Sequence, residues 1–230
     1  MGVAAYLANR YGLQPPDHGG IYGVGETLTY VSHRLLLSDR WLAREFDRSQ
    51  ISKVIPVKGK TPETDAYQRL KADNFTGWKV SVEGLVERPR TFTVAELQRF
   101  PMHSQITHQA CKEGWPFIAE WTGARLSDVL NAVGVQPQAK WVFFFAIDDW
   151  WDSLDLPDPR HPQTFLAYGM NGRELAPDHG APVRLKVARQ LGYKTLKFLN
   201  RITVTDTMKH IGDGLGSGSP SAGYSWYAGI

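Results

Sequence analysis

The sequence predicts a mixed α+β domain, in which several small β-sheets pack with helices. Short apolar segments of strand length are frequent after residue 78, and they do not alternate regularly with the helical segments. A doubly wound parallel sheet needs such alternation, so that class is not favoured. Internal repeats are absent as well.

Length and composition limit the possible functions. The chain has 230 residues, of which 42% are hydrophobic and 21% charged, with a formal net charge of +3. A chain of this size folds without disulfides or structural zinc. The small net charge and the lack of a basic run argue against nucleic-acid binding. No apolar stretch reaches the roughly 18–20 residues that span a bilayer, and residues 1–13 are too short and too polar for a signal-peptide core.

The first third of the chain predicts little regular structure. Residues 1–34 are expected to form an extended lead-in, because residues 14–25, QPPDHGGIYGVG, are rich in Pro and Gly. Residues 38–46 predict a short helix with Ser38 as its cap. Residues 52–66 lack periodicity and predict a long loop, which is often a functional feature.

The main domain is expected over residues 35–206, with its clearest signals after Trp78. Trp78, Val80 and Val82 alternate as in a half-buried strand. Thr93 and Glu96 have the spacing of a capping box that opens a short helix. Apolar residues then recur at helical spacing before a terminating glycine, in Leu126, Val129, Leu130, Val133 and Gly134.

The second half predicts further short strands and a tail. Apolar, strand-like segments occupy residues 140–146, 181–188, 193–199 and 201–206. Residues 207–230 begin as a Gly/Ser-rich segment that should be solvated. They end in Tyr224, Trp226 and Tyr227, which we expect to dock onto the domain because clustered aromatic residues are costly to expose.

Two groups of polar residues have explanations other than catalysis or metal binding. Four carboxylates surround a Trp pair at 150–151, and a solvated loop at a strand end explains most such clusters, although an acid–base pair stays open; they are Asp148, Asp149, Asp152 and Asp155. The histidines at 161, 179 and 210 are widely spaced and form no HExxH pair, so a protein-only zinc or iron site is not expected.

The lone cysteine is the strongest chemical candidate. Cys111 is surrounded in sequence by His108, Lys112, Glu113 and Trp115. A single Cys is commonly an inert buried residue, whereas a Cys–His nucleophile would use His108. Residues 178–194 bring glycines together with cationic donors suited to an anionic ligand, namely His179, Arg184, Arg189 and Lys194. A thiol and these cations together suggest an anionic cofactor whose metal is bound by thiolate.

The segment CKEGWPFIAEWTGARLSDVL resembles the molybdenum-ligand segment of the sulfite oxidase superfamily, and HGAPVRLKVARQLGYKTLK resembles its second signature. The resemblance extends over residues 35–206. It implies a sulfite-oxidase-type molybdopterin-binding fold, similar to bacterial oxidoreductases that consist of the catalytic domain alone, such as protein-methionine-sulfoxide reductase catalytic subunits.

The resemblance also implies a cofactor site. Cys111 would be the protein ligand of a mononuclear molybdenum that carries one molybdopterin, consistent with the preference of such metals for soft thiolate. The cofactor contacts implied are Glu45, Phe46, Ala146, His179, Arg184, Gly192, Tyr193 and Lys194. Two positions depart from the family pattern, since Leu42 replaces a polar residue and Ala146 replaces a Thr.

The implied reaction is oxygen-atom transfer. Sulfite oxidases carry an Arg shortly after the Cys, and residues 112–116 lack one, which leaves Lys112 or His108 to hold an anion. A pocket lined by Trp115, Trp150 and Trp151 would suit a neutral oxide, so reduction of an S-oxide or N-oxide is expected. Glu113 and either Asp148 or Asp149 are candidate proton donors. The alternatives are oxidation of a sulfur compound, a cofactor carrier without turnover, and a metal-free enzyme that depends on Cys111.

Electrons are expected from a separate protein, because no CxxCH haem motif occurs. The resemblance implies a cytochrome or a membrane quinol oxidoreductase as the electron donor. It also implies a periplasmic location, with the cytoplasm as the alternative. A monomer is expected because the dimerisation domain of sulfite oxidases is missing.

Overall fold

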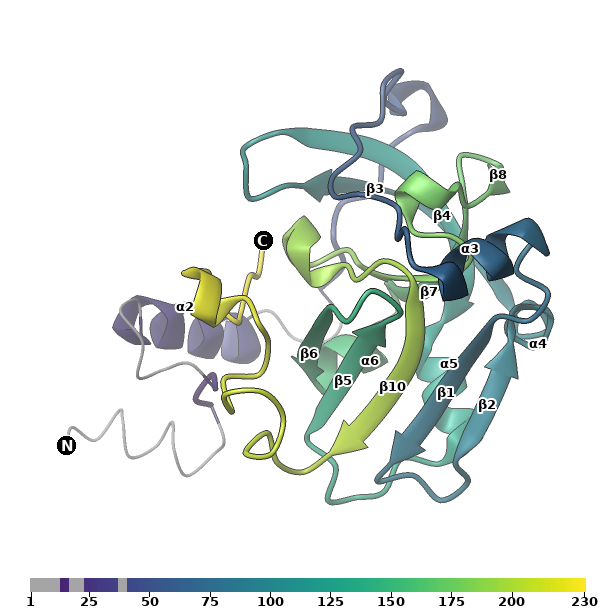
Figure 1. Ribbon diagram of the computed structural model, residues 1–230. Coiled ribbons are helices and arrows are strands. Elements are labelled where there is room, and N and C mark those ends of the chain that lie inside the picture. The colour runs from purple at the N-terminus through teal and green to yellow at the C-terminus, as the bar shows by residue number, and fades with distance from the viewer. Residues whose placement is uncertain (1–12, 17–22, 37–40) are drawn as a thin grey trace.

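The computed structural model describes residues 13–16, 23–36 and 41–230, which form two five-stranded sheets (Figure 1). The first has the order β2 (Arg90–Thr93), β1 (Lys79–Gly84), β10 (Leu199–Thr205), β5 (Trp141–Ala146), β6 (Trp151–Asp155). The second has the order β3 (Met102–Ala110), β4 (Pro116–Arg125), β7 (Thr164–Met170), β8 (Arg173–Glu174), with β9 (Arg184–Val187) paired to β7. The predicted mixed α+β class is confirmed.

Five α-helices and four 3-10 helices connect these strands in the described part of the chain. The α-helices are α2 (Gly23–Leu36), α3 (Asp65–Ala72), α4 (Val94–Leu97), α5 (Leu126–Val133) and α6 (Pro157–Arg160). The 3-10 helices are η1 (Arg48–Gln50), η2 (Pro177–His179), η3 (Gly192–Lys194) and η4 (Pro220–Ala222). None of the described helices is long and apolar enough to cross a membrane.

The main core lies where α5 and the two sheets meet. It joins apolar side chains of β1, β5 and β10 to those of β4, β7, β9 and α5. The apolar face of α5 that the sequence predicts is fully buried, with Leu126, Val129 and Val133 each 0% exposed. Gly134 ends this helix with φ +71°, a left-handed conformation that favours glycine. Burial of such residues is the main term that stabilises the fold.

Several other local predictions are confirmed. The capping box forms, since the Thr93 hydroxyl accepts from the Glu96 backbone N–H and the Glu96 carboxylate accepts from the Thr93 N–H. Residues 52–64 of the predicted 52–66 loop lack regular structure, whereas its last two residues begin α3, and the predicted strand near Trp78 is β1. Residues 140–146 and 201–206 lie largely in β5 and β10.

Four local predictions are wrong. Residues 23–34, expected to be extended, belong to α2, and residues 41–46 form no helix; Ser38 lies outside the described residues. Residues 193–198 form η3 and a loop instead of a strand. In the tail, the Gly/Ser segment is solvated only in part, because Ser217 and Ser219 are buried while Gly212 and Asp213 are exposed.

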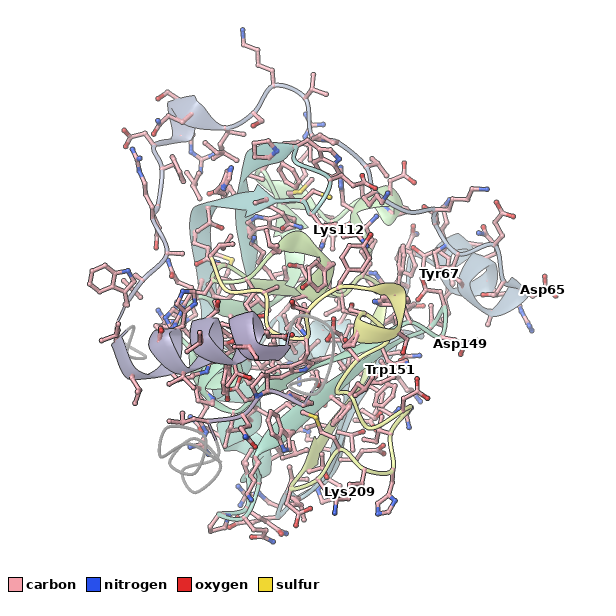
Figure 2. All side chains as sticks on the ribbon, turned by 90° about the vertical axis from the view of Figure 1, so that its left-hand side faces the viewer. Asp65, Tyr67, Lys112, Asp149, Trp151 and Lys209 are labelled. Carbon is pink, nitrogen blue, oxygen red and sulfur yellow. The ribbon has the colours of Figure 1, made fainter. Side chains whose placement is uncertain are left out.

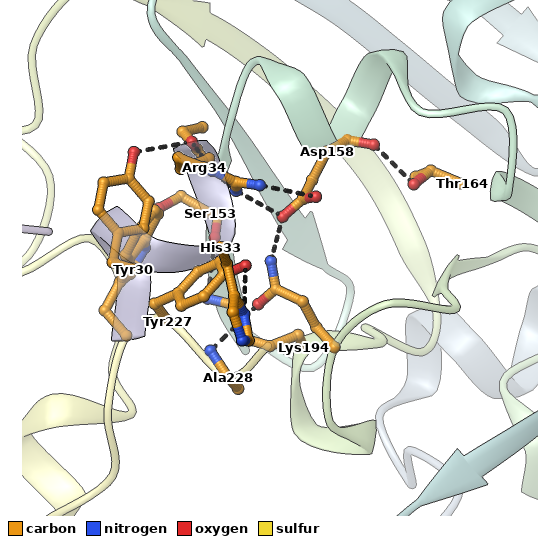
Figure 3. Close-up of polar contacts among 12 residues, drawn as sticks. Tyr30, His33, Arg34, Ser153, Asp158, Thr164, Lys194, Tyr227 and Ala228 are labelled. Atoms are coloured by element: carbon orange, nitrogen blue, oxygen red, sulfur yellow. Dashed lines mark hydrogen bonds and ion pairs between the residues drawn. The ribbon is translucent and has the colours of Figure 1, made fainter. Parts of the chain in front are cut away.

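Helix α2 docks through polar and aromatic side chains (Figure 3). The Arg34 guanidinium bridges two buried carboxylates, with Nη2 2.5 Å from Asp155 Oδ1 and 2.8 Å from Asp158 Oδ2. The Tyr30 hydroxyl donates to Asp155 Oδ2 at 2.8 Å. The helix is therefore attached to β6 and α6 by one ionic cluster, in which the Arg34 guanidinium bridges two carboxylates.

Two of the three C-terminal aromatic residues are buried as the sequence predicts, whereas Tyr224 is 38% exposed and its ring lies 5.9 Å from that of Tyr193. Trp226 and Tyr227 are buried and form a second apolar cluster with Tyr30, Phe143 and Met208. The backbone of residues 228–230 then pairs with the segment before η3: Leu191 N donates to the Ala228 carbonyl at 2.8 Å, and Ile230 N donates to the Arg189 carbonyl at 3.0 Å. The tail is thus part of the folded domain.

Candidate active site

Cys111 lies at the tip of the hairpin formed by β3 and β4. The ladder ends at the pair Ala110–Pro116, and Cys111 N donates to the Trp115 carbonyl at 3.0 Å. Gly114 N donates to the Cys111 carbonyl at 3.0 Å. Gly114 has φ +87°, a left-handed backbone conformation that is strained in residues with a side chain. The turn leaves Cys111 partly exposed. The thiol is therefore available for chemistry.

A pocket of about 400 Å³ opens beside this thiol, and we call it the Cys111 pocket. Its wall comes from four parts of the chain. The hairpin contributes Gln109 and Trp115, the loop after η1 contributes residues 58–60, and the turn between β5 and β6 contributes Asp148 and Trp150. The fourth part is the segment 179–198, which supplies Arg184, Lys197 and His179.

Two glycines bring this fourth part close to the hairpin. A Cβ at Gly192 would lie 3.1 Å from both the Ala110 carbonyl oxygen and Gln109 Nε2. A Cβ at Gly180, whose φ is +101°, would lie 2.9 Å from the Lys197 side chain. Only glycine allows these approaches without displacement. The backbone of η3 is thereby packed against the strand that ends at Cys111.

Arg184 is a buried cation in the pocket wall. Its Nη1 donates to the His179 carbonyl at 2.9 Å and its Nη2 to the Thr195 carbonyl at 2.9 Å, while Nε has no hydrogen-bond partner. Burial lowers the pKa of the Arg184 guanidinium to about 9. A buried cation whose hydrogen bonds all go to neutral carbonyls becomes more favourable when an anion binds beside it.

Other pocket groups share this character. Burial, followed by the charges of Arg184 and Lys197, lowers the pKa of His179, and burial together with Arg184 lowers that of Lys197 to about 8. The Thr195 hydroxyl is buried without a hydrogen-bond partner. Arg184 Nε and the Thr195 hydroxyl, which lack hydrogen-bond partners, fit an anionic, thiolate-ligated cofactor together with the close approach at Gly192 and one accessible thiol.

Tyr193 and Lys194 of η3 point in different directions. The Tyr193 hydroxyl donates to the Ser225 carbonyl at 2.6 Å and its ring lies in the pocket wall. The Lys194 ammonium instead forms a buried ion pair with Asp152 and donates to the Ser153 carbonyl at 2.9 Å. The structure thus places Gly192 and Tyr193 in the pocket wall, and directs Lys194 into the protein.

The remaining expected contacts lie outside this wall. Glu45 forms an isolated bridge with Thr107, and Phe46 N donates to the Ile106 carbonyl at 3.0 Å, so both run along β3. The Phe46 ring lies 6.4 Å from the His108 ring. Ala146 ends β5 and lines a different cavity on the first sheet.

The three candidate proton donors lie in different surroundings. Glu113 forms an ion pair with Lys58 and accepts from Trp115 Nε1 at 3.1 Å, and the Lys58 contact lowers its pKa, so it stays ionised. Asp149 adopts φ +64° and lines the cavity of Ala146, apart from Lys112 and the hairpin tip (Figure 2). Asp148 lines the Cys111 pocket, and desolvation of its carboxyl raises its pKa.

The prediction that tryptophans line the pocket is correct for Trp115 and Trp150, whereas Trp151 packs on Phe143 with 6.0 Å between ring centroids.

The sequence did not point to three residues of the pocket wall, Gln109, Thr195 and Lys197. Gln109 lies two residues before Cys111 on a strand, so period-two alternation could have placed it on the inner face.

Comparison with known proteins identifies the class. The oxidoreductase molybdopterin binding domain family matches residues 67–211, which is more than half of the chain. The chain therefore belongs to this family of molybdopterin-binding oxidoreductases. This finding confirms the resemblance to sulfite-oxidase-type enzymes, and it agrees with a pocket that combines one accessible thiol with buried cations.

Particular relatives are similar over different lengths. The putative protein-methionine-sulfoxide reductase subunit YedZ1 of Azospira oryzae is 30% identical over 194 residues, covering 84% of this chain and 70% of the relative. The protein-methionine-sulfoxide reductase catalytic subunit MsrP of Ralstonia nicotianae is 31% identical, over 56% of this chain and 44% of the relative. MsrP of Campylobacter jejuni is 29% identical, over 63% of this chain and 54% of the relative. The chain thus spans about half the length of each MsrP relative.

A solved structure supports the fold. The crystal structure of the sulfane dehydrogenase SoxCD from Paracoccus pantotrophus matches with a TM-score of 0.55 and 26% identity, over 57% of this chain and 39% of that one. This structural neighbour is named for the dehydrogenation of a sulfane, whereas the three relatives above are named for the reduction of methionine sulfoxide.

Proposed function

We propose that the protein carries out oxygen-atom transfer at a molybdenum cofactor and reduces an S-oxide, with protein-bound methionine sulfoxide as the first candidate. The observation that carries this proposal is the Cys111 pocket, where an accessible thiol faces buried cations in a chain of the molybdopterin-binding family. The names of the three relatives support the substrate class.

In this proposal Cys111 supplies one thiolate to a mononuclear molybdenum that carries one pterin. Arg184, His179 and Lys197 would hold the anionic part of the cofactor by charge and hydrogen bonding. When bound, the cofactor supplies the two-electron oxygen-transfer chemistry. Cationic donors that are already fixed by the fold need little reorganisation, which favours binding.

The protein's own groups then handle water and protons. Trp115, Phe117 and Trp150 give the pocket apolar walls, which limit water near the thiol. Asp148, whose pKa is raised by desolvation, is the pocket carboxyl suited to deliver a proton to the departing oxygen. The overall change is R₂SO plus two electrons and two protons to R₂S and H₂O, with the electrons coming from a cytochrome or a membrane quinol oxidoreductase.

The second candidate is oxidation of a sulfur compound. Lys60 and Lys112 line the same pocket and could hold a sulfur oxyanion, and the SoxCD structure is named for a dehydrogenase. Lys112 Nζ, however, lies 3.3 Å from the centroid of the Tyr224 ring, so one of these cations already has an aromatic partner. For this reason we place oxide reduction first.

One set of assays tests the proposal. Protein from a cofactor-producing host should contain about one molybdenum and one pterin per chain, and Cys111→Ser should lose the molybdenum while keeping its circular dichroism spectrum. With reduced benzyl viologen as donor, a peptide containing methionine sulfoxide should be turned over faster than trimethylamine N-oxide. Faster turnover of sulfite or thiosulfate with ferricyanide would select the second candidate instead.

Two results would reject the enzyme class. Bound cofactor without turnover of any of these compounds would indicate a cofactor carrier. Free alkylation of Cys111 in protein that lacks molybdenum, together with thiol-dependent activity, would indicate a metal-free enzyme. We also propose a periplasmic location for a monomeric protein, which cell fractionation and light scattering test directly.

A further inference from the structure

Lys186 is a fully buried lysine behind the Cys111 pocket. It lies on β9 with 1% of its surface exposed. Its Nζ donates to Gln109 Oε1 at 3.0 Å and lies 3.4 Å from the His108 carbonyl oxygen. Both partners are neutral, and no carboxylate among the described residues lies within ion-pair distance of this ammonium group.

Such an arrangement is costly for the fold. A buried charge normally has an ionic partner, and a charge without one is expensive. Burial, with a further contribution from Arg184, lowers the pKa of Lys186 to about 7. Lys194 is equally buried, at 1% exposed, but it has Asp152 as its counter-ion. The contrast shows that the fold can pair a buried lysine and has not done so for Lys186.

Lys186 and Arg184 form one positive layer. They are two residues apart on β9, so their side chains leave the same face of the strand. Arg184 Cζ and Lys186 Nζ lie 5.0 Å and 5.3 Å from the centroid of the Trp121 ring, which is fully buried. Arg184 is a wall residue of the pocket, and Lys186 extends its positive charge toward β3.

The Lys186 contact also fixes the direction of the Gln109 amide. Because an ammonium group can only donate, it selects the carbonyl oxygen of Gln109. The Nε2 donor of Gln109 then lies 3.1 Å from the position of a Cβ on Gly192, at the pocket wall. Gln109 lies on β3, two residues before Cys111 in the sequence.

We propose that Lys186 is a positioning residue of the cofactor site, which holds the Gln109 amide as a donor toward the cofactor and supplies positive charge behind it. This inference rests on the proposed function, because it assigns the missing anionic partner to the cofactor. It extends the binding machinery from the pocket wall to a residue that does not line the pocket.

The test compares two buried lysines of the full-length chain. Lys186→Met and Lys194→Met are made in a host that produces the cofactor and in one that does not. In the cofactor-free protein, Lys186→Met should melt at the same or a higher temperature, because an unpaired buried charge is removed. Lys194→Met should melt several degrees lower, because Asp152 is left unpaired.

The loaded proteins report the cofactor role. Molybdenum and pterin per chain are measured over time after dilution, and Lys186→Met should lose both about tenfold faster than the parent protein, as expected when a hydrogen bond to a charged group is removed. Gln109→Ala should lose them faster as well. The double variant should be little worse than either single variant, because both substitutions break one interaction.

Each other outcome overturns the inference. If Lys186→Met retains the cofactor as long as the parent protein, Lys186 has no role in holding the cofactor, and the proposed function is unaffected. A cofactor-free Lys186→Met protein that melts as low as Lys194→Met, or does not fold, would show a structural role only. A parent protein that binds neither molybdenum nor pterin would remove the proposed function and this inference together.

Discussion

Asp148 and Asp149 are adjacent in sequence but face different parts of the molecule. Asp149 has φ +64°, and this left-handed turn directs the two side chains to separate cavities. Only Asp148 reaches the Cys111 pocket, where desolvation raises its pKa. A cluster of carboxylates in a sequence therefore identifies the turn, whereas backbone geometry decides which carboxyl is placed for chemistry.

This difference leads to a prediction at the residue scale. Asp148→Asn should reduce turnover by roughly 10²-fold, within the range for loss of a positioned general acid. Asp149→Asn, the matched control one residue away, should change turnover by less than about twofold. Steady-state assays with a constant viologen donor measure both, and equal losses in the two variants would contradict the assignment to Asp148.

At the scale of elements, α2 presents an unusual distribution of polarity. Its Glu26 and Tyr30 are buried, whereas Val24 and Leu28 are 79% and 64% exposed. The helix is attached by the contacts of Tyr30 and Arg34, and Glu26 Oε1 accepts from the Tyr227 backbone N–H at 2.9 Å. Polar interactions, more than apolar burial, dock α2 onto the domain.

Arg34→Met should therefore release α2. The substitution removes the guanidinium that bridges Asp155 and Asp158, and breaking a buried ion pair costs about 3–5 kcal/mol. Hydrogen exchange should increase across residues 23–36, and the free energy of unfolding should fall. Leu35→Ala, at an exposed position of the same helix, serves as the control and should change neither. Unchanged exchange in Arg34→Met would show that other contacts hold α2.

The same elements explain what the sequence could predict. The strands β1, β5 and β10 and the helix α5 were predictable, because apolar residues mark their buried faces. Strand β3 was missed, because its inward residues are the polar Gln105, Thr107 and Gln109. Helix α2 was missed because its exposed and buried faces have the reverse of the usual polarity. Patterns based on apolar burial fail where the interior is polar.

The residues of the site were also predictable only in part. The resemblance led to Cys111, Arg184 and Gly192, which the structure places together around one pocket. It also suggested Lys194, whose ammonium group is paired with Asp152 instead. Lys186 carries no distinguishing signal in the sequence, since a strand lysine is normally solvated, and only its burial identifies it.

At the scale of the whole molecule, Lys186 makes the stability of the cofactor-free protein depend on pH. Its folded pKa of about 7 lies below the unfolded value of about 10.4. Between these values the unfolded chain binds the additional proton, so stability rises with pH across this window and is constant below it with respect to this group. From pH 7 to about pH 8.5 the rise should be on the order of 1–2 kcal/mol.

Urea denaturation of the cofactor-free protein at these two pH values measures this rise. Lys197, whose pKa is lowered to about 8, titrates in the same range. The difference between the parent protein and Lys186→Met isolates the contribution of Lys186. If the two proteins respond equally to pH, Lys186 has an ordinary pKa in the folded state.

The pairing of residues 228–230 with residues 189–191 has a consequence for biosynthesis. The segment that carries Gly192 and Tyr193 is held in place on one side by backbone hydrogen bonds, one that Leu191 donates to Ala228 and one that Ile230 donates to Arg189. A ribosome therefore has to synthesise residues 228–230 before the η3 wall of the pocket is secured. Any cellular factor that delivers the cofactor to the finished wall then acts on a chain in which these residues have already been made and folded back.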